Sequence, residues 1–117
     1  MADTDAATVP QTAAITGPQD LIGRFVIARC RDAGVHAGTL GGLNGERGAT
    51  LQASRRLWSW HAASGAFLSG VAVAGLKPKV CKIGATVDIV LTEVCELIPC
   101  TEEAAASIAG YPTHEPR

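Results

Sequence analysis

The chain has 117 residues, 47% of them hydrophobic and 4% aromatic, and its formal net charge at pH 7 is −1. This length supports one domain, with a core built mainly from Val, Ile, Leu and Ala. The charge is far from that of a dedicated nucleic-acid binder and no apolar run is long enough to span a bilayer, so we expect no specific nucleic acid and no membrane among its partners.

The charged residues are unevenly distributed along the chain. Residues 1–20 carry three aspartates and no basic residue, residues 21–100 carry nine basic and five acidic residues, and residues 101–117 carry one basic and three acidic residues. The body, at +4, suits an acidic partner surface or an anionic small ligand. The N-terminus lacks the layout of a signal peptide, which predicts a cytoplasmic site of synthesis and reduced thiols. These thiols are Cys30, Cys81, Cys95 and Cys100.

The composition divides the chain into three parts. Residues 1–20 are small, polar and acidic, and we expect an extended N-terminal arm that a neighbouring subunit holds in place. Residues 21–110 are predicted to form a single β-rich domain. Residues 111–117 are predicted to be a C-terminal tail.

The first half of the body has the composition of a series of strands. Residues 21–30 are rich in β-branched and aromatic side chains and predict a strand, which a turn at 32–34 connects to a second strand at 35–43. Asn44-Gly45 predicts a two-residue hairpin turn, and residues 46–53 the return strand.

The next predicted strand contains both tryptophans of the chain. In a strand, alternate side chains point to opposite faces. We therefore expect Arg56, Trp58 and Trp60 on one face, and Arg55, Leu57, Ser59 and His61 on the other. The two tryptophans could cover a small core, anchor a protein interface or line a ligand pocket, and packing or an interface is favoured over a pocket.

The rest of the body is expected to contain one long strand and one or two short helices. Residues 62–76 are predicted to be a short helix capped by Ser64, with a hairpin as the alternative. Residues 86–98 are apolar on both faces and predict a central strand. Thr101 is a good N-cap for a helix at 104–109. The predicted fold class is α+β and rich in β-structure: a small antiparallel sheet or partly open barrel.

No pattern in the sequence requires catalysis or a metal. His36 and His61 could converge with Arg55 and a carboxylate such as Glu93, but no spacing demands this arrangement, and a lone strand histidine is far more often structural. The cysteines form no C-x-x-C pair, and the common nucleotide-binding and hydrolase motifs are absent. We therefore expect no catalytic residues, no metal site and no cofactor.

Three segments together resemble a known family. They are GVHAGTL at 34–40, ASRRLWSW at 53–60 and LTEVCELIPCT at 91–101. They resemble a family of small, largely uncharacterised proteins encoded by tailed bacteriophages and prophages, over residues 24–109. The resemblance implies a β-rich single domain with no assigned enzymatic activity. The chain departs from the family pattern at 66–75, where the family is more polar and helix-like, and its acidic arm is additional.

Two functions are consistent with this resemblance. The first is a non-catalytic virion accessory, such as a capsid decoration, head accessory or tail-associated protein. It would be made in the host cytoplasm and then incorporated in the virion, binding other virion proteins or forming a homo-oligomer. The second is an anti-defence protein that sequesters an anionic nucleotide signal in a pocket of Arg, Trp and His side chains. The candidate binding residues are Arg55, Arg56, Trp58, Trp60, His61 and His36.

Overall fold

The computed structural model describes residues 14–115, so most of the expected N-terminal arm, residues 1–13, lies outside the described part. In chain order the elements are η1 (Pro18–Leu21), β2 (Phe25–Cys30), β3 (Val35–Asn44), β4 (Gly48–Ser59), α2 (Phe67–Ala74), β5 (Lys82–Ile83), β6 (Val87–Leu91), β7 (Val94–Pro99) and α3 (Glu102–Ala109). The described helices include none that is long and apolar enough to cross a membrane.

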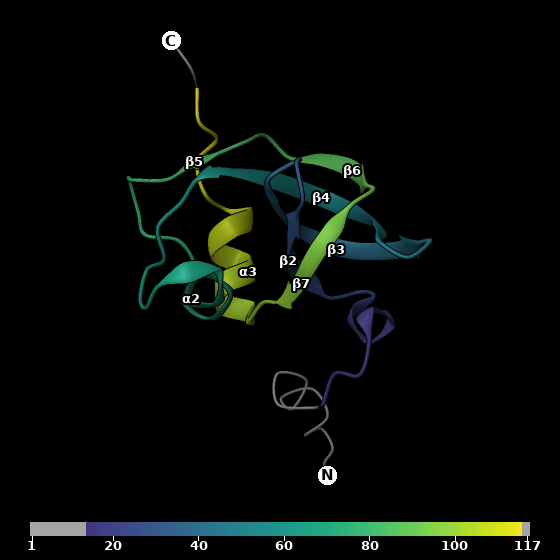
Figure 1. Ribbon diagram of the computed structural model, residues 1–117. Coiled ribbons are helices and arrows are strands. Elements are labelled where there is room, and N and C mark those ends of the chain that lie inside the picture. Colours follow the sequence, from purple (N-terminus) through teal and green to yellow (C-terminus); the bar gives the residue numbers. More distant parts are fainter. Residues whose placement is uncertain (1–13, 116–117) are drawn as a thin grey trace.

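The strands form one six-stranded antiparallel sheet (Figure 1), in the order β5-β4-β3-β2-β7, with β6 also pairing with β4. The sheet curls but does not close. The predicted β-rich fold with one or two short helices is therefore confirmed, as an open sheet with two helices.

The core lies on both faces of this sheet, because β2 is buried on both sides. Val26 and Ala28 face the inside of the curl, while Ile27 faces α2 and α3, which lie together on the other side (Figure 1). The helix-side cluster consists of Ile27, Ala37, Leu57, Leu68, Val71, Ala72, Leu76, Ile83, Cys100, Ala104 and Ile108. The cluster inside the curl consists of Leu21, Val26, Ala28, Cys30, Leu40, Ala49, Leu51 and Leu91.

The first strand is shorter than predicted. Residues 18–21 form a 3₁₀ turn that buries Leu21, and the chain then bends at Gly23, whose φ is +90°. The backbone N–H of Gly23 donates to the carbonyl of Leu40 at 2.8 Å. The predicted strand over residues 21–24 is wrong, because the apolar side chain of Leu21 is buried by a turn and not by strand pairing.

The predicted hairpin between β3 and β4 is confirmed, with a different turn. Asn44 pairs with Gly48, so the loop contains three residues, 45–47, and not two. Beyond the loop, the predicted return strand and the tryptophan strand are one strand, β4. It bends at Ala53, which has a φ of +51°.

The long strand predicted at 86–98 is two strands. The chain turns at Thr92 and Glu93; β6, before the turn, pairs with β4, and β7, after it, pairs with β2. Both strands therefore lie at edges of the sheet, and the predicted central position is wrong. The apolar residues of the segment are not all buried: Leu91 is buried, whereas Val87 and Val90 are exposed.

The helix predicted within 62–76 is confirmed as α2, although its N-cap is Ala66 without a side-chain hydrogen bond, and not Ser64. The helix α3 is capped as predicted, since Thr101 Oγ1 accepts a hydrogen bond from the N–H of Ala104 at 3.0 Å. After α3 the chain continues along the body, and the N–H of His114 donates to the carbonyl of Ile83 at 2.9 Å.

Candidate functional site

The two tryptophans lie in different surroundings. The Trp58 side chain is 66% exposed, whereas Trp60 is half-buried and packs against the helix-side core cluster that contains Leu57. The strand β4 ends at Ser59, so the alternation of faces does not extend to Trp60. The predicted shared face is therefore wrong for Trp60, which packs against the core, whereas Arg56 and Trp58 do lie on one face and contact each other.

Arg55 is a buried structural residue. Arg55 is 2% exposed, and its guanidinium donates hydrogen bonds to the segment that follows α3 and to the loop before β6. The acceptors are the carbonyl oxygens of Gly84 (2.9 Å), Ile108 (3.0 Å), Ala109 (3.4 Å) and Tyr111, and the hydroxyl of Thr113 (2.8 Å). Burial lowers the pKa of Arg55. The carbonyls at a helix C-terminus need donors and favour a positive charge, so Arg55 serves as a C-terminal cap of α3 and is not available to a ligand.

Arg56, one position along, points to the surface and is held by two contacts. Its Cζ lies 4.6 Å from the centre of the Trp58 ring, which is a cation–π contact. On Gly34 an ideal Cβ would lie 3.0 Å from Nη2 and 3.4 Å from Cζ of Arg56, so the guanidinium lies against a glycine backbone. Within residues 14–115 no hydrogen bond or ion pair occupies its N–H groups. A restrained guanidinium with unpaired N–H groups is well prepared for a carboxylate or phosphate.

Arg56 lies at the wall of a hollow of about 520 Å³. Its lining consists of Cys30, Asp32, Ala33, His36, Arg56, Ile89, Val90, Leu91, Thr92 and Glu93. The hollow lies between β6 and the turn that joins β2 to β3. His36 and Arg56 are directly paired in the register of β3 and β4, and the Trp58 ring, which is outside the lining, contacts Arg56. We call Arg56, Trp58, Val90 and this hollow the Arg56–Trp58 face.

The structure therefore brings together three of the six predicted binding residues: His36, Arg56 and Trp58. Glu93, the carboxylate considered with the histidines, also lines the hollow. His61 is outside its lining; its backbone N–H donates to Cys81 Sγ at 3.3 Å.

His36 is a buried, neutral member of the site. Its side chain is 5% exposed, and Nε2 lies 2.9 Å from the carbonyl oxygen of Ala33, so Nε2 carries the proton and donates it. Burial lowers the pKa of His36, and the positive charge of Arg56 lowers it further, while the bond to Ala33 opposes the shift. The imidazole is therefore neutral at pH 7 and contributes no positive charge.

This lowered pKa predicts a loss of stability in mild acid. The unfolded chain has the ordinary histidine pKa of 6.5, above that of folded His36, so it takes up the proton first. The stabilising contribution is complete above pH 6.5 and is lost as the pH falls through the lower, folded value. We expect the free energy of unfolding, measured with urea across this range, to fall more steeply in the wild type than in His36→Gln. An unchanged slope in His36→Gln contradicts the assignment.

The described residues hold no group of three His, Cys, Asp or Glu side chains that could bind a metal ion. The four cysteines all lie within residues 14–115 and form no disulfide there, and two of them are buried in the core. Burial raises the pKa of Cys100 to about 12 and raises that of Cys30 as well. Thiols with a raised pKa are poor nucleophiles, so these two cysteines act as small apolar residues.

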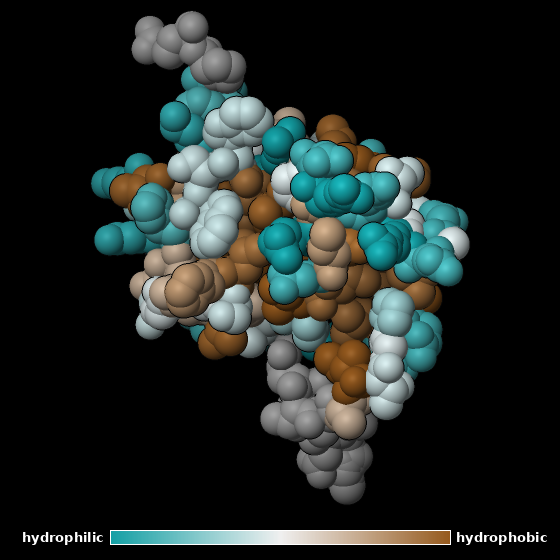
Figure 2. Space-filling model, viewed as in Figure 1, coloured by the Kyte–Doolittle hydropathy of each residue, from teal (hydrophilic) through white to brown (hydrophobic). Residues whose placement is uncertain are grey.

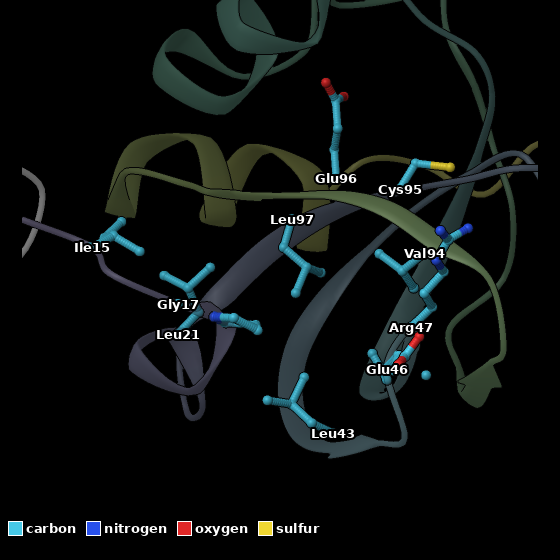
Figure 3. Close-up of a pocket in the computed structure, with 13 residues that line it drawn as sticks. Ile15, Gly17, Leu21, Leu43, Glu46, Arg47, Val94, Cys95, Glu96 and Leu97 are labelled. Carbon is cyan, nitrogen blue, oxygen red and sulfur yellow. The ribbon is translucent and has the colours of Figure 1, made fainter.

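A second concave region was not predicted. It is an apolar cleft of about 260 Å³ between η1, the β3–β4 loop and β7 (Figure 3). Leu97 points toward Leu21 and Leu43 across the cleft, whereas Glu96 points away from it. In Figure 2 the same part of the surface shows apolar side chains between β7 and η1, with polar residues around them. Sequence reasoning missed the cleft because its walls come from three separate segments of the chain.

Comparison with known families identifies the domain but assigns no activity to it. A model for a domain of unknown function, DUF6948, matches residues 23–108, and the chain belongs to this family. No curated protein and no solved structure matches the chain at a significant level. The matched range begins just before β2 and ends within α3, so the sheet, both helices and the Arg56–Trp58 face all belong to the family domain.

Proposed function

We propose that the protein is a non-catalytic component of a bacteriophage particle, a capsid decoration, head accessory or tail-associated protein, which binds other protein subunits through the Arg56–Trp58 face. The phage assignment is supported by the resemblance of the three sequence segments. The binding role is supported mainly by one observation, the 66% exposure of Trp58 on strand β4.

Trp58 has the properties of an interface anchor. Tryptophan and arginine are enriched among the residues that contribute most to protein–protein affinity, because they combine large apolar area with a polar group. The contact with Arg56 restrains the indole before binding, which lowers the entropy cost of association. Val90, which is also exposed and lines the adjacent hollow, extends the apolar surface.

The second candidate function is sequestration of an anionic nucleotide in the hollow. It is supported by the unpaired N–H groups of Arg56 and the exposed indole, which could bind a phosphate and stack on a base. Two features count against it. Arg55 and Trp60, which the sequence suggested as further pocket residues, are engaged in the core. Asp32 and Glu93 line the same hollow, and their negative charges oppose phosphate binding.

The proposal is tested by mass spectrometry of phage particles purified from the strain that carries the gene, with the copy number measured against the major capsid protein. We expect a fixed stoichiometry that survives repeated purification. Absence from the particle would overturn the particle role. In that case a thermal-shift screen of cyclic and ADP-ribose-type nucleotides tests the second candidate, since a ligand that binds the folded state raises its melting temperature.

A further inference from the structure

We propose that the first partner of the Arg56–Trp58 face is a second copy of this chain, related by a twofold axis, so that Arg56 of each copy meets Glu93 and Asp32 of the other. This inference rests on the proposed function, namely that the face is a protein-binding surface, and it identifies the subunit bound there.

The charges on the face are complementary to those of the same face on another copy. Arg56, Asp32 and Glu93 line one hollow, yet no ion pair joins them within the subunit, and no hydrogen bond engages their side-chain charged groups within residues 14–115. A twofold interface brings the same patch of both copies together, so every contact occurs twice. In a symmetric dimer the guanidinium of each copy can thus pair with a carboxylate of the other.

The shape of the face also suits this arrangement. The exposed indole of Trp58 contacts Arg56, and Arg56 lines a hollow of about 520 Å³ whose walls include the apolar side chains of Ile89 and Val90. In a symmetric dimer, each Trp58 can enter the hollow of the other copy, and both indoles lose contact with water together. Among the described strands β6 pairs with β4 alone, so its other edge is free at the rim of the hollow. Such free edges are sites where a second chain adds to a sheet.

A second copy fits the hollow better than a partner of one charge sign. An acidic peptide or a nucleotide would pair with Arg56 but would be repelled by Asp32 and Glu93, and a basic partner would be repelled by Arg56. A small domain also gains the stability it lacks alone when it forms oligomers. The body of this chain has few large side chains with which to build a core.

The test is a charge-reversal cycle on the full chain, with the dimer dissociation constant measured by sedimentation equilibrium. We expect the wild type to be a dimer. Arg56→Glu and Glu93→Arg should each raise the dissociation constant roughly 100-fold, since a close ion pair is often worth about tenfold or more in affinity and symmetry doubles each effect. The double variant restores opposite charges and should return the constant to within about tenfold of the wild type. Lys79→Glu and Glu46→Arg, exposed charges outside the hollow, are the matched controls and should leave it unchanged.

A second pair of variants tests the aromatic contact. Trp58→Ala should abolish the dimer, whereas Phe67→Ala should not, although the Phe67 side chain is 79% exposed. Three results would overturn the inference: a monomeric wild type, single charge reversals that leave the dissociation constant unchanged, or a double variant that remains monomeric. Circular dichroism of each variant separates loss of the dimer from loss of the fold. If the protein is a monomer but is present in phage particles, self-docking is contradicted and the particle role stands. If it is a dimer but is absent from particles, the particle role is contradicted and self-docking stands.

Discussion

Replacing Arg55 by Met is expected to lower the free energy of unfolding by about 3 kcal/mol, because buried acceptors lose their donors while most of the apolar contact of the side chain is kept. The guanidinium connects three parts of the fold: the loop at Gly84, the C-terminal end of α3, and the segment at Thr113. Arg55→Lys should lose roughly 1–2 kcal/mol, because a single ammonium group cannot span these acceptors. Urea unfolding followed by circular dichroism measures both effects.

Arg56→Met is the matched control for this prediction. The two arginines are neighbours in β4, but Arg56 is exposed, so its replacement should change the free energy of unfolding by no more than about 1 kcal/mol. Equal losses at the two positions would contradict the structural role of Arg55 and return it to the set of ligand-binding candidates.

Gly38→Ala is expected to cost about 3 kcal/mol, because β3 and β4 approach too closely at this point to accept a methyl group. An ideal Cβ on Gly38 would lie 2.8 Å from Cα of Ser54 and 2.9 Å from the carbonyl oxygen of Gln52. Both atoms belong to the backbone of β4, so the two strands would have to separate. The bend in β4 at Ala53 brings its backbone toward Gly38, which explains the glycine in this segment.

Gly42→Ala in the same strand provides the comparison. Apart from Gly42 itself and its two chain neighbours, no residue has an atom within 4 Å of an ideal Cβ at this position, so we expect a change of no more than about 0.5 kcal/mol. Thermal and urea unfolding of the two variants side by side measure the difference. A Gly38→Ala variant as stable as Gly42→Ala would show that β3 and β4 do not approach as closely as the structure has them.

The elements that sequence reasoning predicted well are those with a local signal. The cap at Thr101 and the hairpin near Asn44 depend on residues whose conformational preferences are strong within a few positions. The bend at Ala53 and the turn at Thr92–Glu93 have no such signal, because neither contains a glycine or a proline. As a result, the single strand β4 was predicted as two strands, whereas β6 and β7 were predicted as one strand at 86–98.

Part of the candidate site could be predicted, because that part also has a local signal in the sequence. Arginine beside tryptophan in a strand indicated a surface with binding chemistry, and His36, Arg56 and Trp58 do lie together. The role of Arg55 could not be predicted, because most of its acceptors are backbone carbonyls, which every residue has. Which of two adjacent arginines is buried depends on how α3 and the segment after it pack against β4, and that packing is a long-range property of the fold.

The binding role of the Arg56–Trp58 face is tested most directly by the occupancy of phage particles after complementation of a gene deletion with Trp58→Ala or Phe67→Ala. Both variants remove an exposed aromatic side chain, but only Trp58 lies on the Arg56–Trp58 face. We predict that the copy number per particle falls sharply for Trp58→Ala and stays at the wild-type value for Phe67→Ala. Equal occupancy for the two variants, at the wild-type level, would contradict the assignment of this face as the binding surface.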